Sequence, residues 1–260
     1  MLCLCHGFAA EPGGEWFVTG HGDIESVSVS FRRRVDGVEA CCSWSAVDAE
    51  VLGSVVPWRT FRWSQGQKHY SGTFWSATEE GHVIYESRLE LARLLFADFD
   101  LSVRHIVAQP FLLRADVDNV VRKHIPDYLL FTDTGPVVVD VKPRRRLATP
   151  ANTVIFGWTR RAVESRGWRY EVWSEPPQAE LENLRFLAGY RRCWLFDQEL
   201  LDQLRRSDLD GVTVGAASRS VPARPEPVVR AAVLHLLWRQ EFTVDLTRPL
   251  SSGHVLRRAG

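Results

Sequence analysis

The sequence predicts an α/β protein: a mixed β-sheet flanked by helices, followed by a smaller helical domain. Between residues 82 and 175, short apolar segments alternate with segments of helical periodicity in the order α-β-β-β-α-β. The dipeptide Pro176-Pro177 interrupts this pattern. Beyond it, apolar residues recur at helical spacing in residues 179–191, 198–206 and 228–240.

The composition is that of a globular protein with no overall charge. Of the 260 residues, 45% are apolar and 25% are charged, and a chain of this length buries a substantial core. Lysine plus arginine equals aspartate plus glutamate at 32 each, so the chain as a whole is not a polycation. A nucleic-acid surface therefore requires local separation of charge.

The five cysteines argue against a zinc site and against an oxidising compartment. None of them forms a CxxC pair, and no histidine cluster has zinc-ligand spacing. The odd count, the lack of a basic leader and the lack of an apolar run of about 18 residues predict a cytoplasmic protein without a membrane span.

The chain divides into four segments. Residues 1–14 are predicted to be a loose tail. Residues 15–75 form a β-rich N-terminal segment, in which residues 26–34 alternate in polarity. Residues 76–177 contain the α/β core. Residues 178–260 contain helices followed by a two-stranded ribbon, an order that predicts a small winged-helix-like domain.

Each element of the core has its own signal. Residues 82–100 predict the end of a strand and a buried helix of about three turns, because leucines fill adjoining stripes. Pro110 breaks a strand predicted over residues 103–117. A helix over residues 151–166 stops at a glycine, and the last strand covers residues 168–175.

Residues 124–143 are predicted to form a β-hairpin around the turn residues 132–135. A loop of two or four residues gives the register that pairs Asp127 with Asp140, and alternation places Lys142 on the Asp140 face. A three-residue turn would break this register. Two carboxylates facing each other at about 5 Å repel unless a cation lies between them. A divalent metal is the simplest such cation, so the pattern indicates metal-assisted phosphodiester cleavage.

The same residues also have a purely structural interpretation. Asp and Lys at strand ends are often solvated, and a surface ion pair between Asp140 and Lys142 would contribute under about 1 kcal/mol. The register, the valine-rich second strand and the basic run that follows favour the metal site. From Lys142 to Arg169, eight Lys or Arg stand against one acid, which indicates a phosphate-facing surface rather than an ordinary solvated face.

A third acid is expected from the helix that precedes the hairpin. Glu90 is the best candidate, but Ser87 and Glu90 also match a capping box, in which the glutamate closes the start of the helix. Glu86, one turn away, is the alternative acid. A cap residue affects stability and a metal ligand affects turnover, so the two interpretations can be separated by experiment.

Four further features carry less weight. His124, near Asp127, could act as a base, but a histidine at a strand edge is more often structural. Cys41-Cys42 has no neighbours in sequence that would activate a thiol. GHGD at residues 20–23 is too short for a phosphate loop, and Gln109-Pro110 predicts a bend in a strand.

Four blocks of sequence, taken in order, resemble one known family. YESRLELARLLFADFD, AQPFLL, IPDYLL and VVVDVKP, within residues 80–175, resemble the TnsA-type endonuclease subunit of heteromeric transposases, in the PD-(D/E)xK restriction-endonuclease-like superfamily. The resemblance implies a restriction-endonuclease-like sheet and a winged-helix-like C-terminal domain that contacts partners. It identifies the helical acid as Glu90. The remaining motif residues are Asp127, Asp140 and Lys142.

The resemblance also implies how the site would work. Magnesium, replaceable by manganese, would be held by Glu90, Asp127, Asp140 and the carbonyl of Val141. Lys142 would orient or help deprotonate a metal-bound water, or neutralise the phosphate. Basic residues expected to contact phosphates of double-stranded DNA are Lys142, Arg144, Arg145, Arg146, Arg160 and Arg161.

Such a subunit nicks the 5′ strand at transposon ends, together with a transposase subunit and an AAA+ ATPase regulator of the same element. Two other functions are compatible with the sequence. One is a non-catalytic DNA-binding or assembly scaffold, and the other is a PD-(D/E)xK nuclease in phage DNA processing or restriction. Metal binding distinguishes the scaffold from the nucleases, and the neighbouring genes distinguish the two nucleases.

Overall fold

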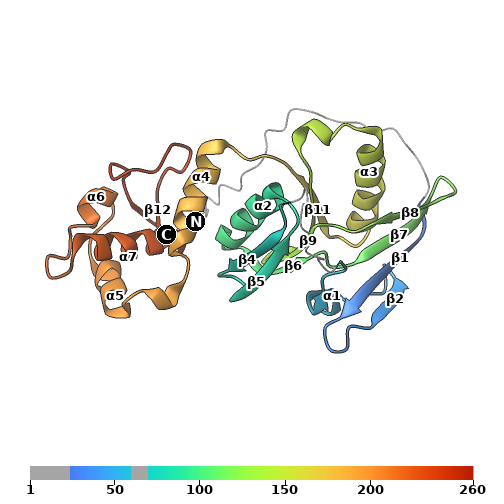
Figure 1. Ribbon diagram of the computed structural model, residues 1–260, viewed down its shortest axis with the longest axis horizontal. Coiled ribbons are helices and arrows are strands. Elements are labelled where there is room, and N and C mark those ends of the chain that lie inside the picture. Colours follow the sequence, from blue (N-terminus) through green and yellow to red (C-terminus); the bar gives the residue numbers. More distant parts are fainter. Residues whose placement is uncertain (1–23, 60–69, 260) are drawn as a thin grey trace.

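The structure is a computed structural model that describes residues 24–59 and 70–259. The tail predicted at residues 1–14 and the GHGD segment at residues 20–23 lie outside these ranges. Within the described residues the protein is a mixed α/β protein, as predicted. Figure 1 shows its helices and strands in sequence colours.

The central element is a mixed four-stranded sheet with the strand order β11-β10-β9-β6. Its strands β9 and β10 are antiparallel neighbours, and β11 runs parallel to β10. Parallel neighbours need a crossover, which the helix α3 (Pro150–Glu164) provides. The strand bounds are Val103–Ala108 for β6, Tyr128–Thr132 for β9, Gly135–Val141 for β10 and Arg169–Trp173 for β11.

Both faces of this sheet are covered, which explains its unbroken apolar runs. On one face, Tyr128 and Val139 join the hydrophobic cluster that contains the leucines of α2 (Arg88–Phe99). On the other face, Leu129 and Val138 join a second cluster that contains α3. The buried three-turn helix predicted within residues 82–100 is therefore confirmed.

A second sheet contains the N-terminal strands and has the order β2-β1-β7-β8, with β3 paired to β1. Its elements are β1 (Ile24–Arg33), β2 (Glu39–Ser43), β3 (Val55–Val56), β7 (Leu112–Val117) and β8 (Val120–His124). The short helix α1 (Ala49–Gly53) lies between β2 and β3. The β-rich character predicted for residues 15–75 is confirmed where the structure describes them, but β1 pairs with β7 of the core rather than forming a separate unit.

Two strand boundaries differ from the prediction. The break at Pro110 is present, but the two pieces, β6 and β7, belong to different sheets. Asp118 and Asn119 both have positive φ (56° and 60°) and turn β7 directly into β8, a pattern typical of a tight hairpin. His124 therefore ends β8 of the second sheet, and the prediction that the 124–143 hairpin begins there is wrong.

A separate hairpin, β4 (Gly72–Ser76) with β5 (Gly81–Tyr85), leads into α2. Asp98 of α2 accepts hydrogen bonds from the Ser76 hydroxyl at 2.6 Å and from the backbone amides of Ala77 and Thr78. These bonds fix the hairpin turn to the helix. The boundary predicted between residues 75 and 76 falls inside β4.

The C-terminal segment is helical and ends in a short ribbon. Pro177, at the predicted boundary, immediately precedes α4. The elements are α4 (Gln178–Leu187), α5 (Gln198–Arg206), α6 (Val214–Ala217), α7 (Glu226–Trp238), β12 (Phe242–Thr243) and β13 (Arg257–Arg258). Short 3-10 helices occur at η1 (Arg144–Arg146), η2 (Ala188–Tyr190) and η3 (Cys193–Leu195). In the part of the chain that the structure describes, no helix combines the length and apolar character needed to cross a membrane.

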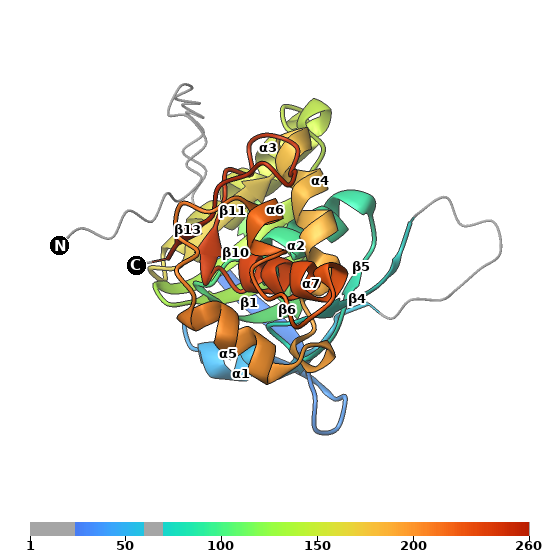
Figure 2. The same cartoon turned by 90° about the vertical axis from the view of Figure 1, so that its left-hand side faces the viewer.

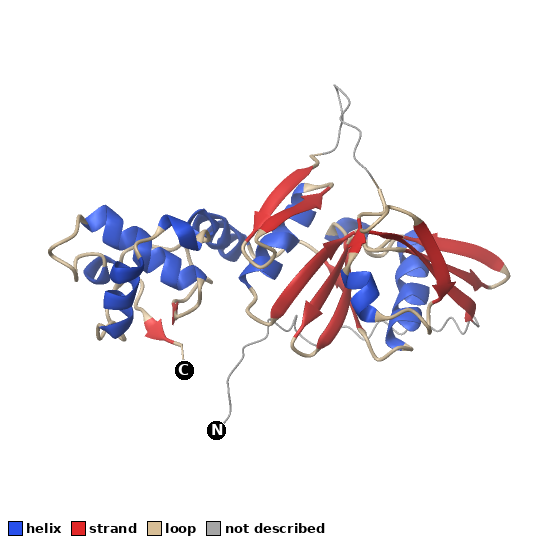
Figure 3. Cartoon of the chain, turned by 90° about the horizontal axis from the view of Figure 1, so that it is seen from below, coloured by secondary structure: helices blue, strands red, loops and turns tan. Residues whose placement is uncertain are grey.

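The C-terminal helices share a hydrophobic cluster with α2 and the central sheet. Phe99, at the end of α2, packs on Trp238 of α7 with ring centroids 5.3 Å apart. The Gln240 side-chain amide donates a hydrogen bond to the carbonyl of Phe99. Figures 1 and 2 show these helices at one end of the molecule, and Figure 3 shows the two sheets toward the other end.

Candidate functional site

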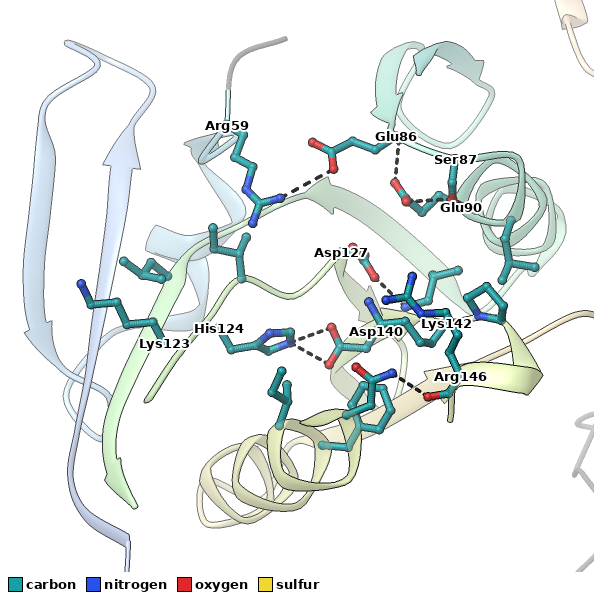
Figure 4. A pocket seen from close by; sticks show the side chains of 18 of the residues that line it. Arg59, Glu86, Ser87, Glu90, Lys123, His124, Asp127, Asp140, Lys142 and Arg146 are labelled. Atoms are coloured by element: carbon teal, nitrogen blue, oxygen red, sulfur yellow. Dashed lines mark hydrogen bonds and ion pairs between the residues drawn. The ribbon is translucent and has the colours of Figure 1, made fainter. Parts of the chain in front are cut away.

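A pocket of about 710 Å³ opens where the two sheets, the start of α2 and the region from η1 to α3 meet. Its lining contains acidic, basic and imidazole side chains from five parts of the chain (Figure 4). The charged or titratable residues that line it are Arg59, Glu86, Glu90, Lys123, His124, Asp127, Asp140, Lys142 and Arg146. All four residues predicted to be catalytic therefore lie around one pocket.

The hairpin that places the two aspartates has a two-residue loop, Asp133-Thr134, which is one of the two loop lengths that give the predicted register. Gly135 takes the positive φ (107°) that the turn requires. Regular pairing runs back to Tyr128 and Val139, and it stops one pair short of Asp127 and Asp140. The predicted direct pairing of the two aspartates is therefore not part of the ladder.

The ladder stops at this point because the backbone changes its hydrogen bonds. The amide of Asp127 donates to the carbonyl of Val139 at 3.0 Å. The carboxylate of Asp127 accepts a hydrogen bond from the amide of Val141 at 2.6 Å. The side chain of Asp127 thus accepts a hydrogen bond from the backbone of β10, in place of regular backbone pairing. Both aspartates still line the same pocket.

Asp127 carries the largest electrostatic perturbation among the predicted catalytic residues. Burial, together with the negative charges of Asp140 and Glu90, raises the pKa of its carboxyl to about 8. The hydrogen bond from Val141 and the positive charge of Lys142 act in the opposite direction on this pKa. Burial is the largest of these causes, so the Asp127 carboxyl lies where its charged form is poorly solvated.

Asp140 is held by two residues that the sequence did not identify as functional. It is only 1% exposed, and the Nε2 atom of His124 lies 2.8 Å from each of its carboxylate oxygens. The hydroxyl of Tyr170 on β11 donates a hydrogen bond to the same carboxylate. The sequence feature that could have identified His124 is the Asp118-Asn119 turn, because a hairpin there brings the end of β8 to the pocket. No comparable signal marked Tyr170.

Glu90 forms the helix cap that the capping-box interpretation predicted. Ser87 is the N-cap of α2, and its hydroxyl accepts from the Glu90 amide at 3.1 Å. The Glu90 carboxylate accepts in turn from the Ser87 hydroxyl at 2.8 Å and from the Glu86 amide at 2.6 Å. The same carboxylate lines the pocket, where burial raises its pKa. Capping is confirmed, and the role of Glu90 as a metal ligand stays a prediction.

Gln109 forms hydrogen bonds to two acidic residues of the pocket, Glu86 and Asp127. It is 6% exposed and has a positive φ (46°), an unusual backbone state for a residue other than glycine. Its side-chain amide donates to Glu86 at 2.8 Å, and its backbone amide donates to the carbonyl of Asp127 at 2.8 Å. Arg59 completes the group, since its amide donates to the Gln109 side chain and its guanidinium lies 3.7 Å from Glu86. The bend predicted at Gln109-Pro110 thus also connects the segments that contain Arg59, Glu86 and Asp127 through hydrogen bonds.

The basic residues predicted to contact phosphates lie in two places, at the pocket with η1 and on α3. Lys142 and Arg146 line the pocket, and Arg144 and Arg145 are exposed beside them in η1. The exposed pair Arg160 and Arg161 lies on α3, and Arg160 forms an ion pair with Glu164 at 3.2 Å.

Arg166, counted in the same run, has a structural role. Its guanidinium lies against the rings of Trp44 and Trp168 and donates to the carbonyls of Trp44 and Val47. It is therefore not part of a phosphate-facing surface.

The donor set suits a hard divalent cation, although its side chains have other partners in the structure. Glu90 closes a helix, and Asp140 is held by His124 and Tyr170. Accordingly, among the described residues no three His, Cys, Asp or Glu side chains are grouped so that they could hold a metal ion as they lie. Carboxylate oxygens are the ligands that Mg²⁺ prefers, and the negative charges of Asp140 and Glu90 both act on the Asp127 carboxyl.

Comparison with known proteins identified no relative. No family model matches the chain, and no curated protein matches it. The function is therefore argued from the geometry and charge of this pocket.

Proposed function

We propose that the protein is a metal-dependent DNA endonuclease with a PD-(D/E)xK site, and that it acts as a TnsA-like subunit nicking the 5′ strand at transposon ends. The observation that carries this proposal is the convergence of Glu90, Asp127, Asp140 and Lys142 on one pocket. Burial, together with the negative charges of Asp140 and Glu90, raises the pKa of Asp127, and a carboxyl perturbed in this way inside a pocket is typical of a functional site.

The order of elements around the pocket supports the same proposal. The helix α2, the strands β6, β9 and β10, the helix α3 and the strand β11 occur in this order along the chain, with β7 and β8 of the second sheet inserted after β6. The acid from α2 and the acids from the β9–β10 hairpin reach the pocket from different elements. A resemblance carried by four sequence blocks thus agrees with the positions of those blocks in space.

The roles of the residues follow from their chemistry. Magnesium would be held by Glu90, Asp127, Asp140 and the carbonyl of Val141, and it would supply Lewis-acid stabilisation of the phosphorane charge together with an activated water. Lys142, whose positive charge lowers the pKa of both Asp127 and Glu90, would neutralise the scissile phosphate or orient the water. The exposed arginines of η1 and α3 would contact neighbouring phosphates, which positions DNA without reading its sequence.

The C-terminal segment fits partner contact better than groove reading. Its order of α5, a bridging residue Thr213 paired with Val255, α6, α7 and the β12–β13 ribbon corresponds to a winged-helix-like domain. In DNA-reading versions of such domains, a helix places exposed side chains in the major groove. Residues 232–238 of α7 are all buried, so the exposed part of this helix is limited to its first turn, residues 226–230, in which Val229 is buried. Target choice would then come from the transposase subunit and the AAA+ ATPase regulator.

The decisive experiment is a nicking assay on a transposon-end duplex with the partner subunits present. Lys142→Ala and Asp127→Asn are expected to abolish nicking while the fold is retained. Asp133→Asn is the matched control, because Asp133 is an exposed aspartate in the turn of the same hairpin. Nicking by either site variant at the rate of the control would contradict the proposal.

The alternative of a non-catalytic scaffold is favoured by one observation: Glu90 and Asp140 already have protein partners. Calorimetry with Mn²⁺ in the presence of DNA tests it. Binding tighter than millimolar that Asp127→Asn removes supports the nuclease, whereas no binding supports the scaffold. Nicking that needs no partner subunit would instead indicate a PD-(D/E)xK nuclease of phage DNA processing or restriction.

A further inference from the structure

The second sheet has one apolar face and one polar face. The apolar face is buried against α3 and includes Val29, Phe31, Leu113, Ala115 and Val117. Alternation and the strand register place a different set of side chains on the opposite face. This outer face comprises Ser28, Ser30, Arg32, Glu39, Cys41, Ser43, Leu112, Arg114, Asp116, Val121 and Lys123.

Arg114 and Lys123 are directly opposite each other on this outer face. The register pairs them across β7 and β8, and both side chains are exposed. Like charges in that position, with Cβ atoms about 5 Å apart, destabilise a sheet unless an anion lies between them. Among the side chains of residues 26–59 and 70–259, neither cation has an ion-pair partner. Asp116 lies on the same face, two residues from Arg114 and opposite Val121 rather than Lys123.

This cationic pair adjoins the candidate catalytic pocket. Lys123 and Leu112, both on the outer face, are also among the residues that line the pocket. In Figure 4 the Lys123 side chain extends from the rim of the pocket, away from Asp140 and toward the N-terminal sheet. A polymer of phosphates that extends from the pocket onto this face therefore meets Lys123 first and then Arg114, on the neighbouring strand.

The remainder of the outer face is suited to a duplex rather than to a single strand. Single-stranded nucleic acid is held mainly by aromatic side chains on which its bases stack. None of the outward-facing described residues of β1, β2, β7 and β8 is aromatic, and the ring of Trp58 beside them is covered by the guanidinium of Arg32, 5.3 Å from the ring centroid. Three serines, Ser28, Ser30 and Ser43, lie on the face, and such hydroxyls donate hydrogen bonds to phosphate oxygens.

We propose that Arg114 and Lys123 form a phosphate-binding pair, and that the outer face of the β2-β1-β7-β8 sheet holds the double-stranded DNA that leads into the pocket. This inference rests on the proposed nuclease function, and it gives the N-terminal segment a role. The bound phosphate also relieves the repulsion between the two cations.

The experiment measures binding of a fluorescent DNA duplex to the full-length protein in EDTA, over a range of salt concentrations. Each phosphate contact contributes about 0.9 to the slope of log K against log salt concentration, so losing both contacts should reduce the slope by about 2. We expect Arg114→Gln and Lys123→Gln each to weaken binding about tenfold near 0.1 M salt. The matched controls are Arg185→Gln and Arg206→Gln, which remove exposed arginines from α4 and α5.

Thermal unfolding shows whether weaker binding results from misfolding. Removing one of two like charges should leave the Tm of Arg114→Gln unchanged or slightly higher. An unchanged salt slope in the double variant, or an equal loss in the controls, would overturn the inference. Tighter binding to a single strand or to duplex RNA than to duplex DNA would also overturn it.

The outcome is separable from the proposed function. If Asp127→Asn nicks normally, the nuclease assignment fails, whatever the binding of the Arg114 and Lys123 variants shows. If Arg114→Gln and Lys123→Gln bind duplex DNA as wild type does while Asp127→Asn abolishes nicking, only the inference about the sheet fails.

Discussion

Replacing Asp127 by asparagine is expected to stabilise the metal-free protein at neutral pH. The pKa of this carboxyl is about 8 in the folded protein, against an ordinary value of 3.8. In the unfolded chain the group ionises above about pH 4, whereas the folded protein keeps the proton up to about pH 8. The folded state therefore binds more protons in this window, so the free energy of unfolding falls as the pH rises through it.

The size of the effect follows from the two pKa values. Each pH unit between them removes about 1.4 kcal/mol, so the full penalty at pH 7 would be about 4 kcal/mol. Asp127 is partly open to the pocket, and water there screens the charge. We therefore expect Asp127→Asn to raise the free energy of unfolding by about 2 kcal/mol at pH 7 and by little at about pH 4. The asparagine oxygen can still accept the hydrogen bond from the Val141 amide.

The assay is urea unfolding in EDTA at several values between about pH 4 and pH 8, below and above which the effect should level off. Asp133→Asn is the control with the opposite sign, because Arg104 holds the pKa of the Asp133 carboxyl below its usual range. Its stabilisation is present above the ordinary pKa and is lost as the pH falls, so this variant should lose a little stability only at the higher pH. A pH-independent effect of Asp127→Asn, or a loss of stability at pH 7, would refute the electrostatic reasoning.

Three further predictions follow from the contacts. Ser87→Ala should lower the free energy of unfolding by about 1 kcal/mol through loss of the N-cap, whereas Glu90→Gln, which still accepts hydrogen bonds, should leave urea stability nearly unchanged and abolish Mn²⁺ binding in calorimetry. Equal Mn²⁺ affinity in wild type and Glu90→Gln would remove Glu90 from the ligand set. His124→Leu should destabilise the protein by about 1 to 3 kcal/mol in urea, because it removes a hydrogen-bond partner from the buried carboxylate of Asp140. A neutral result would mean that water replaces the imidazole. Arg166→Lys should lower the Tm, since an ammonium cannot donate to two carbonyls while lying flat against two indole rings, and an unchanged Tm would show that these contacts contribute little.

The sequence was most informative where the signal was local. The two-residue turn before Gly135, the helix from Arg88 and the stop after residues 151–166 depend on turn chemistry and periodicity within a few positions. Asp127, Asp140 and Lys142, which line the pocket, were also selected from local motif spacing, whereas Glu90 was chosen over Glu86 by the family resemblance.

The remaining features depend on contacts between distant segments. The strand broken at Pro110 contributes to two sheets, and the choice of partner for each piece is made by β1 and β9, far away in the sequence. His124 and Tyr170 reach Asp140 only after β8 and β11 have found their own neighbours. Single-sequence patterns contain little information on such pairings: the Asp118-Asn119 turn could have indicated His124, and no local pattern marked Tyr170.

The hydrophobic cluster shared by α2 and the C-terminal helices has a practical consequence for dissecting the protein. Cutting the gene after Pro177 would leave the ring of Phe99 without Trp238 and would uncover the leucines of α2 that pack beneath α4 and α7. The truncated product should aggregate rather than behave as a minimal enzyme. Because α2 also supplies Glu90 near its opposite end, any protein that binds the C-terminal helices contacts the helix that carries this acid, about 14 Å along its axis from Phe99.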